Sequence, residues 1–383
     1  MLKFKFSLLL LISIAMWVDV SACTSALVSG RLTRDGRPLM WKNRDTNDLN
    51  NRIKRIVAHD GLLEFVALFD ARDTRDTAAW MGMNERGFAI MNTASYNLNH
   101  DTIPEEMMDG EGVLMRMALE RCSTLADFET LLDTLPRPLR VEANFGVMDS
   151  NGDAAYYETG NYKYVKFDLN DAPEGFIIRT NYSYSGDKDR GYGYIRERNA
   201  LTLLSPHVAA CDIEPATFTD ELSRTFYNSQ TGEIYNAITA NAVPEWVVDQ
   251  DYIPRRISSA SVVIEGIKTG EPTQLTTMWV ALGYPPCAVV QPVWCGEGGV
   301  PLSLQGCGDN NHAPECDIVN ARKADVFSIK RGNGMHYIHM TRLYNSEGTG
   351  YCQTLIKRAL AAYEQGRNER NRRAVALTQD QQQ

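Results

Sequence analysis

Residues 23–45 read CTSALVSGRLTRDGRPLMWKNRD and have the pattern of a β-hairpin. Each half carries apolar and β-branched residues, which favour strands. The segment 34–37 (RDGR) between the halves is a turn signal, because aspartate and glycine tolerate the backbone angles of tight turns. We therefore predict two neighbouring antiparallel strands, with Cys23 at the start of one and Asp45 at the end of the other.

Apolar patterns place further strands and helices along the chain. Strand patterns continue to residue 96 and return at 144–181 and 258–294. Apolar residues three and four positions apart predict helices at 112–135, 192–204, 218–228 and 350–375. Because the strands occur in groups without a regular strand–helix alternation, we predict an α+β fold. No linker or repeat interrupts 23–375, so we predict one domain there, followed by a disordered tail at 376–383.

The first 22 residues have the layout of a secretory signal peptide. Two lysines precede an apolar run at 6–18, and small residues follow at 20–22. The apolar run is too short for a membrane span, and no later segment reaches 18 apolar residues. We therefore expect an exported protein, secreted or periplasmic, that has no membrane span and whose mature form begins at Cys23.

The composition narrows the class of protein. The chain has 383 residues, of which 44% are hydrophobic and 23% charged, as in globular proteins with a sizeable core. Lysine and arginine total 39 and aspartate and glutamate 48, a net charge of −9, and no basic stripe is interleaved with aromatic residues. A nucleic-acid partner is therefore not expected. The sequence also lacks the motifs GxGxxG, GxxxxGK[ST], HExxH and GxSxG, and we expect no cofactor.

Four of the eight cysteines lie close together in a glycine- and proline-rich segment, 285–320, which we interpret as an insertion or extended loop. They are Cys287, Cys295, Cys307 and Cys316. In an exported protein such a cluster predicts disulfides. A zinc site is the alternative, but no CxxC pair occurs and His312 alone would complete it, so we expect no metal.

Cys23 has unusual chemistry if the chain is cut after Ala22. It would then carry a thiol and a free α-amine on one carbon. An α-amine has a pKa near 8, roughly two units below that of lysine, so a useful fraction is unprotonated at neutral pH. One residue would supply both nucleophile and base. The site would still need a group to hold the amine and donors for an oxyanion.

Three polar side chains at strand ends are candidates for these roles. Asp45 ends the strand that pairs with the start of the hairpin, Asn92 lies inside the apolar run FAIMNTASY, and Asn181 ends FIIRTN. A buried amide must be hydrogen-bonded, since an unpaired one costs about 1–3 kcal/mol. The alternative for each is a purely structural strand-end or turn residue.

The same segments resemble the N-terminal-nucleophile (Ntn) hydrolases that use an N-terminal cysteine. Within them the chain is similar to the linear-amide C–N hydrolases: choloylglycine hydrolases, penicillin acylases of that type and isopenicillin N acyltransferase-like proteins. Four stretches carry the likeness, namely the hairpin 23–45, GMNERGFAIMNTASY (82–96), NFGVMDSNGDAAYYETG (144–160) and FIIRTNYS (176–183). Together they extend over about 160 residues.

The resemblance implies a fold and a set of roles. The fold is the αββα sandwich, two antiparallel sheets between helical layers. Cys23 matches the nucleophile, Asp45 the group that binds the α-amine or substrate amide, Asn92 the oxyanion-hole side chain and Asn181 a second structural asparagine.

The resemblance also implies positively charged side chains that bind substrate. Lys42 stands where bile-salt hydrolases carry arginine, and Arg44 lies two positions on, on the same strand face. The family also carries an arginine later in the chain, which corresponds here to Arg256 or its neighbour Arg255. The implied substrate is a small linear amide, with water or an amine accepting the acyl group. A homo-oligomer is compatible with the sequence.

Three alternatives stay open. Val20-Ser21-Ala22-Cys23 is compatible with a bacterial lipobox, which would make Cys23 a lipid anchor and the domain a binding module. Against it, Asp19 interrupts the apolar run, and a strand follows Cys23 without a polar tether. Cys23 could instead form a disulfide. A dipeptidase branch of the same superfamily also begins with Cys-Thr, so small peptides are alternative substrates.

Overall fold

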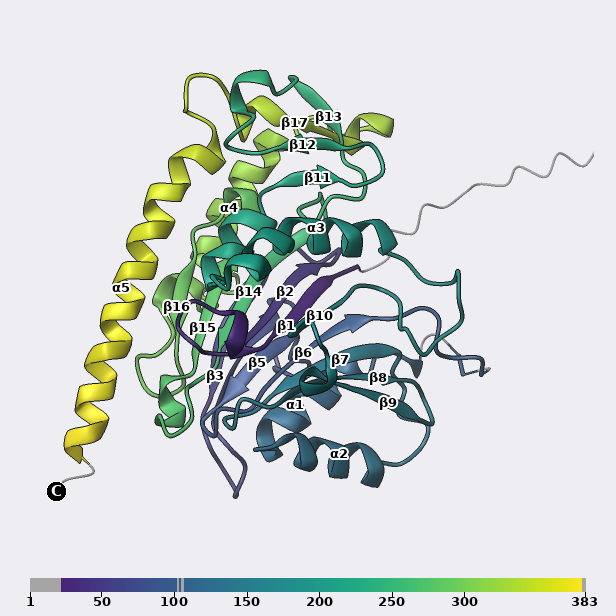
Figure 1. Cartoon of the computed structure of the whole chain (residues 1–383), viewed down its shortest axis with the longest axis vertical. Coiled ribbons are helices and arrows are strands. Elements are labelled where there is room, and N and C mark those ends of the chain that lie inside the picture. Colours follow the sequence, from purple (N-terminus) through teal and green to yellow (C-terminus); the bar gives the residue numbers. More distant parts are fainter. Residues whose placement is uncertain (1–21, 102, 105–106, 381–383) are drawn as a thin grey trace, which may run out of the picture.

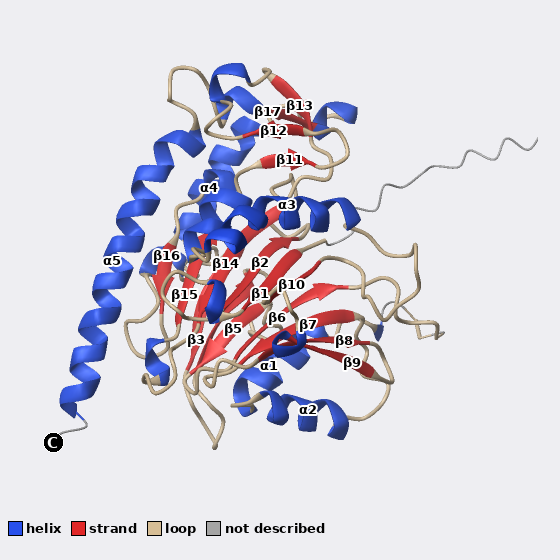
Figure 2. Ribbon diagram, in the orientation of Figure 1, coloured by secondary structure: helices blue, strands red, loops and turns tan. Residues whose placement is uncertain are grey.

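The computed structural model of the protein describes residues 22–101, 103, 104 and 107–380. Two antiparallel sheets form its centre (Figures 1 and 2). The first has six strands in the order β10 (Phe176–Arg179), β1 (Thr24–Val28), β2 (Leu39–Asp45), β14 (Ser258–Glu265), β15 (Thr277–Leu282) and β16 (Gln291–Val293). The predicted hairpin 23–45 is confirmed: β1 pairs with β2, and Ala26 lies opposite Trp41.

The second sheet has seven strands that follow one another in chain order. They are β3 (Asn51–Ile56), β4 (Phe65–Asp70), β5 (Met81–Asn84), β6 (Ala89–Ala94), β7 (Ala143–Met148), β8 (Ala154–Thr159) and β9 (Tyr164–Asp168). Gly82 on β5 is required by packing, because a Cβ atom there would lie 2.6 Å from the Val66 carbonyl oxygen and 2.9 Å from the Leu119 side chain.

Three apolar clusters divide the molecule into four layers. One joins the inner faces of the two sheets, with Met40 and Val262 on one side and Val66 and Met91 on the other. A second packs the outer face of the seven-stranded sheet against α1 (Glu111–Arg121) and α2 (Leu125–Thr134). A third packs the outer face of the six-stranded sheet against α3 (Tyr194–Ala210) and α5 (Tyr351–Asp380). This order of layers confirms the predicted α+β fold, the αββα sandwich.

A smaller group of elements lies at one end of the sandwich, at the top of Figure 1. It contains the two-stranded sheets β11 (Phe226–Asn228) with β12 (Glu233–Tyr235) and β13 (Trp246–Val248) with β17 (Tyr337–His339), together with α4 (Pro314–Val326). A fourth apolar cluster, which includes Phe226, Tyr284, Val319 and Ile338, holds them together.

The structure corrects two predicted helices. The segment 112–135 forms two helices because Thr124 caps the second one: its hydroxyl accepts from the Asp127 backbone N–H, and the Asp127 side chain accepts from the Thr124 N–H. The segment 218–228 forms a short π-helical turn, Thr217–Leu222, and then β11. Phe226 pairs with Tyr235 there, so pairing with the next strand along the chain, β12, favours a strand at this place.

Two predictions at the C-terminal side also differ from the structure. The segment 285–320 is more than a loop, since it contains β16 and the start of α4. The predicted tail at 376–383 is helical as far as Asp380, because α5 continues through residues of high helix propensity such as alanine and leucine; the last three residues lie outside those described.

The predicted disulfides are wrong: all eight cysteines, each in the described part of the chain, are unpaired. Cys316 packs in the core between the sheets, whereas Cys287 belongs to the cluster at the end of the sandwich. Burial raises the pKa of the thiols of Cys287 and Cys316, so both behave as small apolar core residues.

The described residues show neither a membrane-spanning helix nor a metal-binding cluster. In that part of the chain, no helix combines the length and apolar character of a membrane span. No three histidine, cysteine, aspartate or glutamate side chains come together there as metal ligands. Residues 1–21, most of the predicted signal peptide, lie outside the described residues.

Candidate active site

Antiparallel pairing brings three distant segments together at Cys23. β1 pairs with β2 on one side and β10 on the other, and Ser25 lies opposite both Lys42 and Arg179. The start of β1 is therefore flanked by the ends of β2 and β10, where Asp45 and Asn181 lie. Cys23 is buried, with 6% of its surface exposed, and its Sγ lies 3.9 Å from the main-chain oxygen of Asp45.

A side chain holds the nitrogen of Cys23. This nitrogen donates a hydrogen bond of 2.8 Å to Oδ1 of Asn181, and Asn181 Nδ2 donates to the Ala94 carbonyl oxygen at the end of β6. In the unprocessed chain the donor is a peptide N–H, which marks the position that the α-amine would occupy after cleavage. Asn181 therefore joins the proposed terminal residue to both sheets.

Arg196 on α3 completes this contact and was not predicted from the sequence. Its guanidinium donates to the Cys23 carbonyl oxygen (2.6 Å), the Thr24 hydroxyl (2.9 Å) and Oδ1 of Asn181 (2.8 Å). Burial lowers the pKa of Arg196 to about 10. The available signal was spacing: Arg196 lies four and eight positions before the buried Ala200 and Leu204, on the inward face of the predicted helix.

Asp45 is buried, and neighbouring side chains donate to both of its carboxylate oxygens. Its Oδ1 accepts from Ser258 Oγ (2.6 Å) and Asn43 Nδ2 (3.0 Å), and its Oδ2 accepts from Arg255 Nε (2.7 Å). Of the two arginines expected here, Arg255 binds this carboxylate. Arg256 has its main-chain N–H on Asp249 and lines a separate cavity that begins at Thr46.

Lys42 and Asn92 meet across the two sheets. Lys42 Nζ donates to Oδ1 of Asn92 (2.7 Å) and to the carbonyl oxygen of Trp80 (2.8 Å). Because an ammonium group can only donate, the amide oxygen of Asn92 must face it. The Asn92 Nδ2 group donates to no described residue and so can serve an incoming oxyanion. Burial lowers the pKa of Lys42 to about 8, and the neighbouring Asp70 and Asp45 act in the opposite direction.

Arg44 has a different role from Lys42, although both point toward Trp80. Its guanidinium forms an ion pair of 2.8 Å with Asp70 and lies 5.0 Å from the centre of the Trp80 ring. Both members of the ion pair are at least nine-tenths buried. The positive charge of Arg44 is therefore balanced, and Lys42 is the cation that reaches Asn92.

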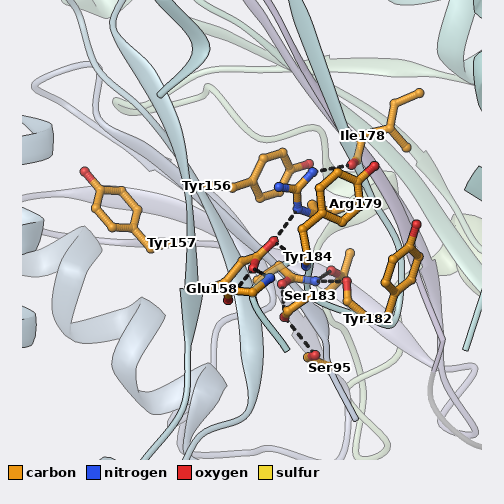
Figure 3. A network of polar contacts seen from close by, with 12 residues as sticks. Ser95, Tyr156, Tyr157, Glu158, Ile178, Arg179, Tyr182, Ser183 and Tyr184 are labelled. Carbon is orange, nitrogen blue, oxygen red and sulfur yellow. Dashed lines mark hydrogen bonds and ion pairs between the residues drawn. The ribbon is translucent and has the colours of Figure 1, made fainter. Parts of the chain in front are cut away.

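A buried network fixes the turn that follows Asn181 (Figure 3). Arg179 on β10 donates to Glu158 on β8 (2.8 Å), and its guanidinium lies 3.9 Å from the centre of the Tyr184 ring. The Glu158 carboxylate also accepts from the backbone N–H groups of Tyr184 (2.9 Å) and Ser185 (2.7 Å). These charge-assisted bonds anchor the chain on both sides of Asn181, and Arg196 binds the Asn181 side chain itself.

The aromatic residues near the predicted site have different surroundings. Trp41 is buried and stacks on Phe218, so it packs the core. The hydroxyls of Tyr182 and Tyr184 both donate to Glu197. The carbonyl oxygen of Trp80 accepts from Lys42, and its indole N–H donates to the Asp70 carboxylate. Tyr96 packs edge-on against Tyr192.

Lys42 makes stability depend on pH in a predictable direction. Its pKa is about 8 in the folded chain and near 10.4 unfolded, so between these values the unfolded chain binds more protons and stability rises with pH. From pH 7.5 to 10, we expect the free energy of unfolding to rise by about 2 kcal/mol more than in a Lys42→Met variant. Urea unfolding of both proteins, in a Cys23→Ser background that removes the thiol titration, measures this difference. The prediction would be wrong if the free energy of unfolding changed equally with pH in the two proteins.

A comparison with family models finds one match to this chain. Residues 32–200 match the family model "Acyl-coenzyme A:6-aminopenicillanic acid acyl-transferase". The match spans less than half of the chain; it includes Lys42, Asp45, Asn92 and Asn181, and it begins after Cys23. It confirms the predicted resemblance to acyltransferase-like enzymes.

Several solved structures are similar to this chain. The Caenorhabditis elegans ortholog of N-acylethanolamine-hydrolyzing acid amidase is 13% identical, with 63% of this chain and 92% of that chain covered and a TM-score of 0.40. A mutant of the conjugated bile acid hydrolase from Clostridium perfringens is 10% identical (71% and 92% covered, TM-score 0.45). Penicillin V acylase from Agrobacterium tumefaciens is 12% identical (71% and 86% covered, TM-score 0.38). A search of curated proteins found no match.

Proposed function

We propose that this chain is an exported cysteine amidohydrolase whose nucleophile is Cys23, freed by cleavage after Ala22. The observation that carries the proposal is the hydrogen bond from the Cys23 nitrogen to Asn181 Oδ1, beside a buried thiol. An ordinary strand residue would pair its N–H with a neighbouring main chain. Here a side chain receives it, as an α-amine at a strand start would require.

The proposed first half-reaction uses only groups of this chain. The α-amine takes the proton of the Cys23 thiol, and the sulfur attacks the carbonyl carbon of the amide. The carbonyl oxygen becomes an oxyanion, to which Asn92 Nδ2 donates while Lys42 holds the Asn92 oxygen. The C–N bond then breaks, the leaving nitrogen takes the proton from the ammonium group of Cys23, and a thioester remains.

The second half-reaction releases the acyl group. Water gives a proton to the α-amine and attacks the thioester carbon, and the sulfur leaves and takes the proton back. The products are a carboxylic acid and the free enzyme. An amine in place of water would give acyl transfer with the same bonds made and broken.

The charges around Cys23 suit this sequence of steps. The cations Arg196 and Arg255 lie next to the groups that hold Cys23, through Asn181 and Asp45 respectively. A nearby positive charge disfavours protonation of an amine and favours a thiolate. Lys42 adds positive charge on the side of the oxyanion.

A panel of linear amides tests the proposal on the mature chain. Bile-acid conjugates, penicillins, N-acyl amino acids and dipeptides represent the substrate classes that the resemblance implies. We expect one class to be cleaved, with release of amine and acid in equal amounts. Acid-quenched samples should show an acyl adduct on Cys23 by peptide mass spectrometry, and added hydroxylamine should divert the acyl group to a hydroxamate. Turnover with the adduct on another residue, or cleavage of no class, would contradict the proposal.

A further inference from the structure

The main chain around Asn181 is held by a side chain of the opposite sheet. Asn181 lies two residues after β10, an edge strand of the six-stranded sheet, and Asn144 lies on β7 of the seven-stranded sheet. Nδ2 of Asn144 donates to the carbonyl oxygens of Thr180 (3.2 Å) and Tyr182 (3.1 Å), the residues on either side of Asn181. One amide group therefore spans the residue that receives the Cys23 nitrogen.

The neighbours of the Asn144 amide define its orientation. A main-chain carbonyl oxygen can only accept, so the NH2 group of Asn144 must face Thr180 and Tyr182. The amide oxygen accepts from the Ser183 hydroxyl (2.5 Å), and Nδ2 also lies 3.1 Å from Oγ1 of Thr93 on β6. The side chain is 0% exposed, so bulk water would not replace a bond that is lost. The amide is thus fixed in place.

Asn97, which follows β6, extends this support along the same turn. Its Oδ1 accepts from the Ser183 N–H (2.8 Å), and its Nδ2 donates to the Ser183 carbonyl oxygen (2.9 Å). Glu158 on β8 holds the N–H groups of Tyr184 and Ser185. Side chains of the seven-stranded sheet and of the loop after β6 therefore hold the whole turn that follows β10.

The contact between Asn181 and Cys23 depends on where this turn lies. Oδ1 of Asn181 is 2.8 Å from the Cys23 nitrogen, and hydrogen bonds weaken beyond about 3.2 Å. A general base must also lie within hydrogen-bond reach of the proton that it takes. A displacement of about 1 Å in a group that orients the reactants can slow a reaction 100-fold. The bonds from Asn144 to the main chain oppose such a displacement.

We propose that Asn144 is a positioning residue of the active site: it fixes Asn181 and, through Asn181, the α-amine of Cys23 beside the thiol. The inference rests on the proposed function, because the α-amine exists only after cleavage in front of Cys23. Since Asn144 acts through the main chain around Asn181, its loss should slow the chemical step more than it weakens substrate binding.

The first test compares Asn144→Ala with Asn84→Ala in the mature chain. Asn84, at the end of β5 in the same sheet, is 1% exposed, and its Nδ2 donates to the carbonyl oxygens of Leu119 (2.9 Å) and Cys122 (2.8 Å). Both variants therefore lose buried bonds to two carbonyl oxygens, but the partners of Asn84 pack on the outer face of the sheet. We expect Asn144→Ala to lower kcat at least about tenfold with KM within about threefold, and Asn84→Ala to keep kcat within about threefold.

The second test needs no substrate. The rate at which iodoacetamide alkylates Cys23, followed by peptide mass spectrometry, reports how readily the thiol loses its proton. An α-amine that is no longer held beside the thiol takes this proton less readily. At pH 7 we expect the rate to fall at least about fivefold in Asn144→Ala and in Asn181→Ala, and no further in the double variant, because both changes remove the same interaction. Asn84→Ala should alkylate like the unsubstituted protein.

Two results would overturn the proposal: alkylation of Cys23 in Asn144→Ala at the rate of Asn84→Ala, or losses from Asn144→Ala and Asn181→Ala that add in the double variant. If Asn144→Ala does not fold, Asn144→Ser takes its place in each comparison. Its hydroxyl can donate to one acceptor only, so we expect the same losses at a level of at least about threefold.

The two tests also separate this inference from the proposed function. If no amide is cleaved, the alkylation rates still decide whether Asn144 acts on Cys23 through Asn181. If an amide is cleaved through Cys23 and Asn144→Ala behaves like Asn84→Ala, the proposed function stands and the positioning role is wrong.

Discussion

Cys23→Ser is expected to lower kcat/KM for the cleaved amide at least about 10³-fold, with the fold unchanged. Serine has nearly the shape of cysteine, so the buried position at the start of β1 tolerates it. A hydroxyl, however, is far less acidic than a thiol, and an α-amine is too weak a base to activate it well. The measurement is steady-state kinetics, with circular dichroism and thermal unfolding to verify the fold.

Cys211→Ser is the matched control for this prediction. Cys211 is an exposed, unpaired cysteine at the end of α3, remote from the residues that hold Cys23. We expect it to keep full activity. If Cys23→Ser retained activity within tenfold of the unsubstituted protein, another residue would have to be the nucleophile.

One extra residue in front of Cys23 is expected to reduce turnover at least about 10²-fold, the range of a general base. The nitrogen of Cys23 would then be a peptide N–H, which donates to Asn181 Oδ1 as in the unprocessed chain but cannot accept the thiol proton. The experiment compares the mature chain with a chain that begins with a glycine before Cys23. Mass spectrometry must show that the glycine is retained during the assay.

Enzymatic removal of that glycine provides the control, since it restores the amine in the same preparation and should restore activity. An extended chain that turns over at the mature rate would rule out the α-amine as the base.

The mass of the natural N-terminal peptide distinguishes cleavage that frees Cys23 from processing that attaches a lipid to it. An unmodified Cys23 is expected, whereas a diacylglyceryl adduct would support the lipid-anchor alternative.

The site concentrates buried polar groups at the ends of central strands. Lys42, Asp45, Asn181 and Arg196 are each no more than 2% exposed. Such groups are costly to bury, and here the cost is offset by short hydrogen bonds among them and to the main chain. Donors that are already oriented need little rearrangement when charge develops on a substrate, which is the main advantage of a preorganised site.

Much of the fold and part of the site follow from local pattern. Alternating apolar residues and the 34–37 turn predict the hairpin, and an antiparallel hairpin necessarily places the start of one strand beside the end of the other. Cys23 and Asp45 could therefore be placed together from the sequence. Asn92 and Asn181 stood out as amides in apolar strands, and the structure brings one to Lys42 and the other to Cys23.

Contacts between distant segments could not be predicted in this way. Arg196 lies 173 residues from the carbonyl oxygen of Cys23, and Arg255 lies 210 residues from Asp45. The predicted disulfides are wrong for a related reason, because nearness in sequence does not fix where a cysteine packs: Cys287 and Cys316 belong to separate apolar clusters, and Cys307 is exposed.

The sequence by itself determined the α+β class, the hairpin and the residue that begins it. These depend on the period of apolar side chains and on turn chemistry, which act over a few residues. Only the tertiary structure decided which cations surround Cys23 and which carboxylates they pair with. Those outcomes depend on burial and on partners hundreds of residues away, and desolvation of a charge exists only once the chain has packed around it.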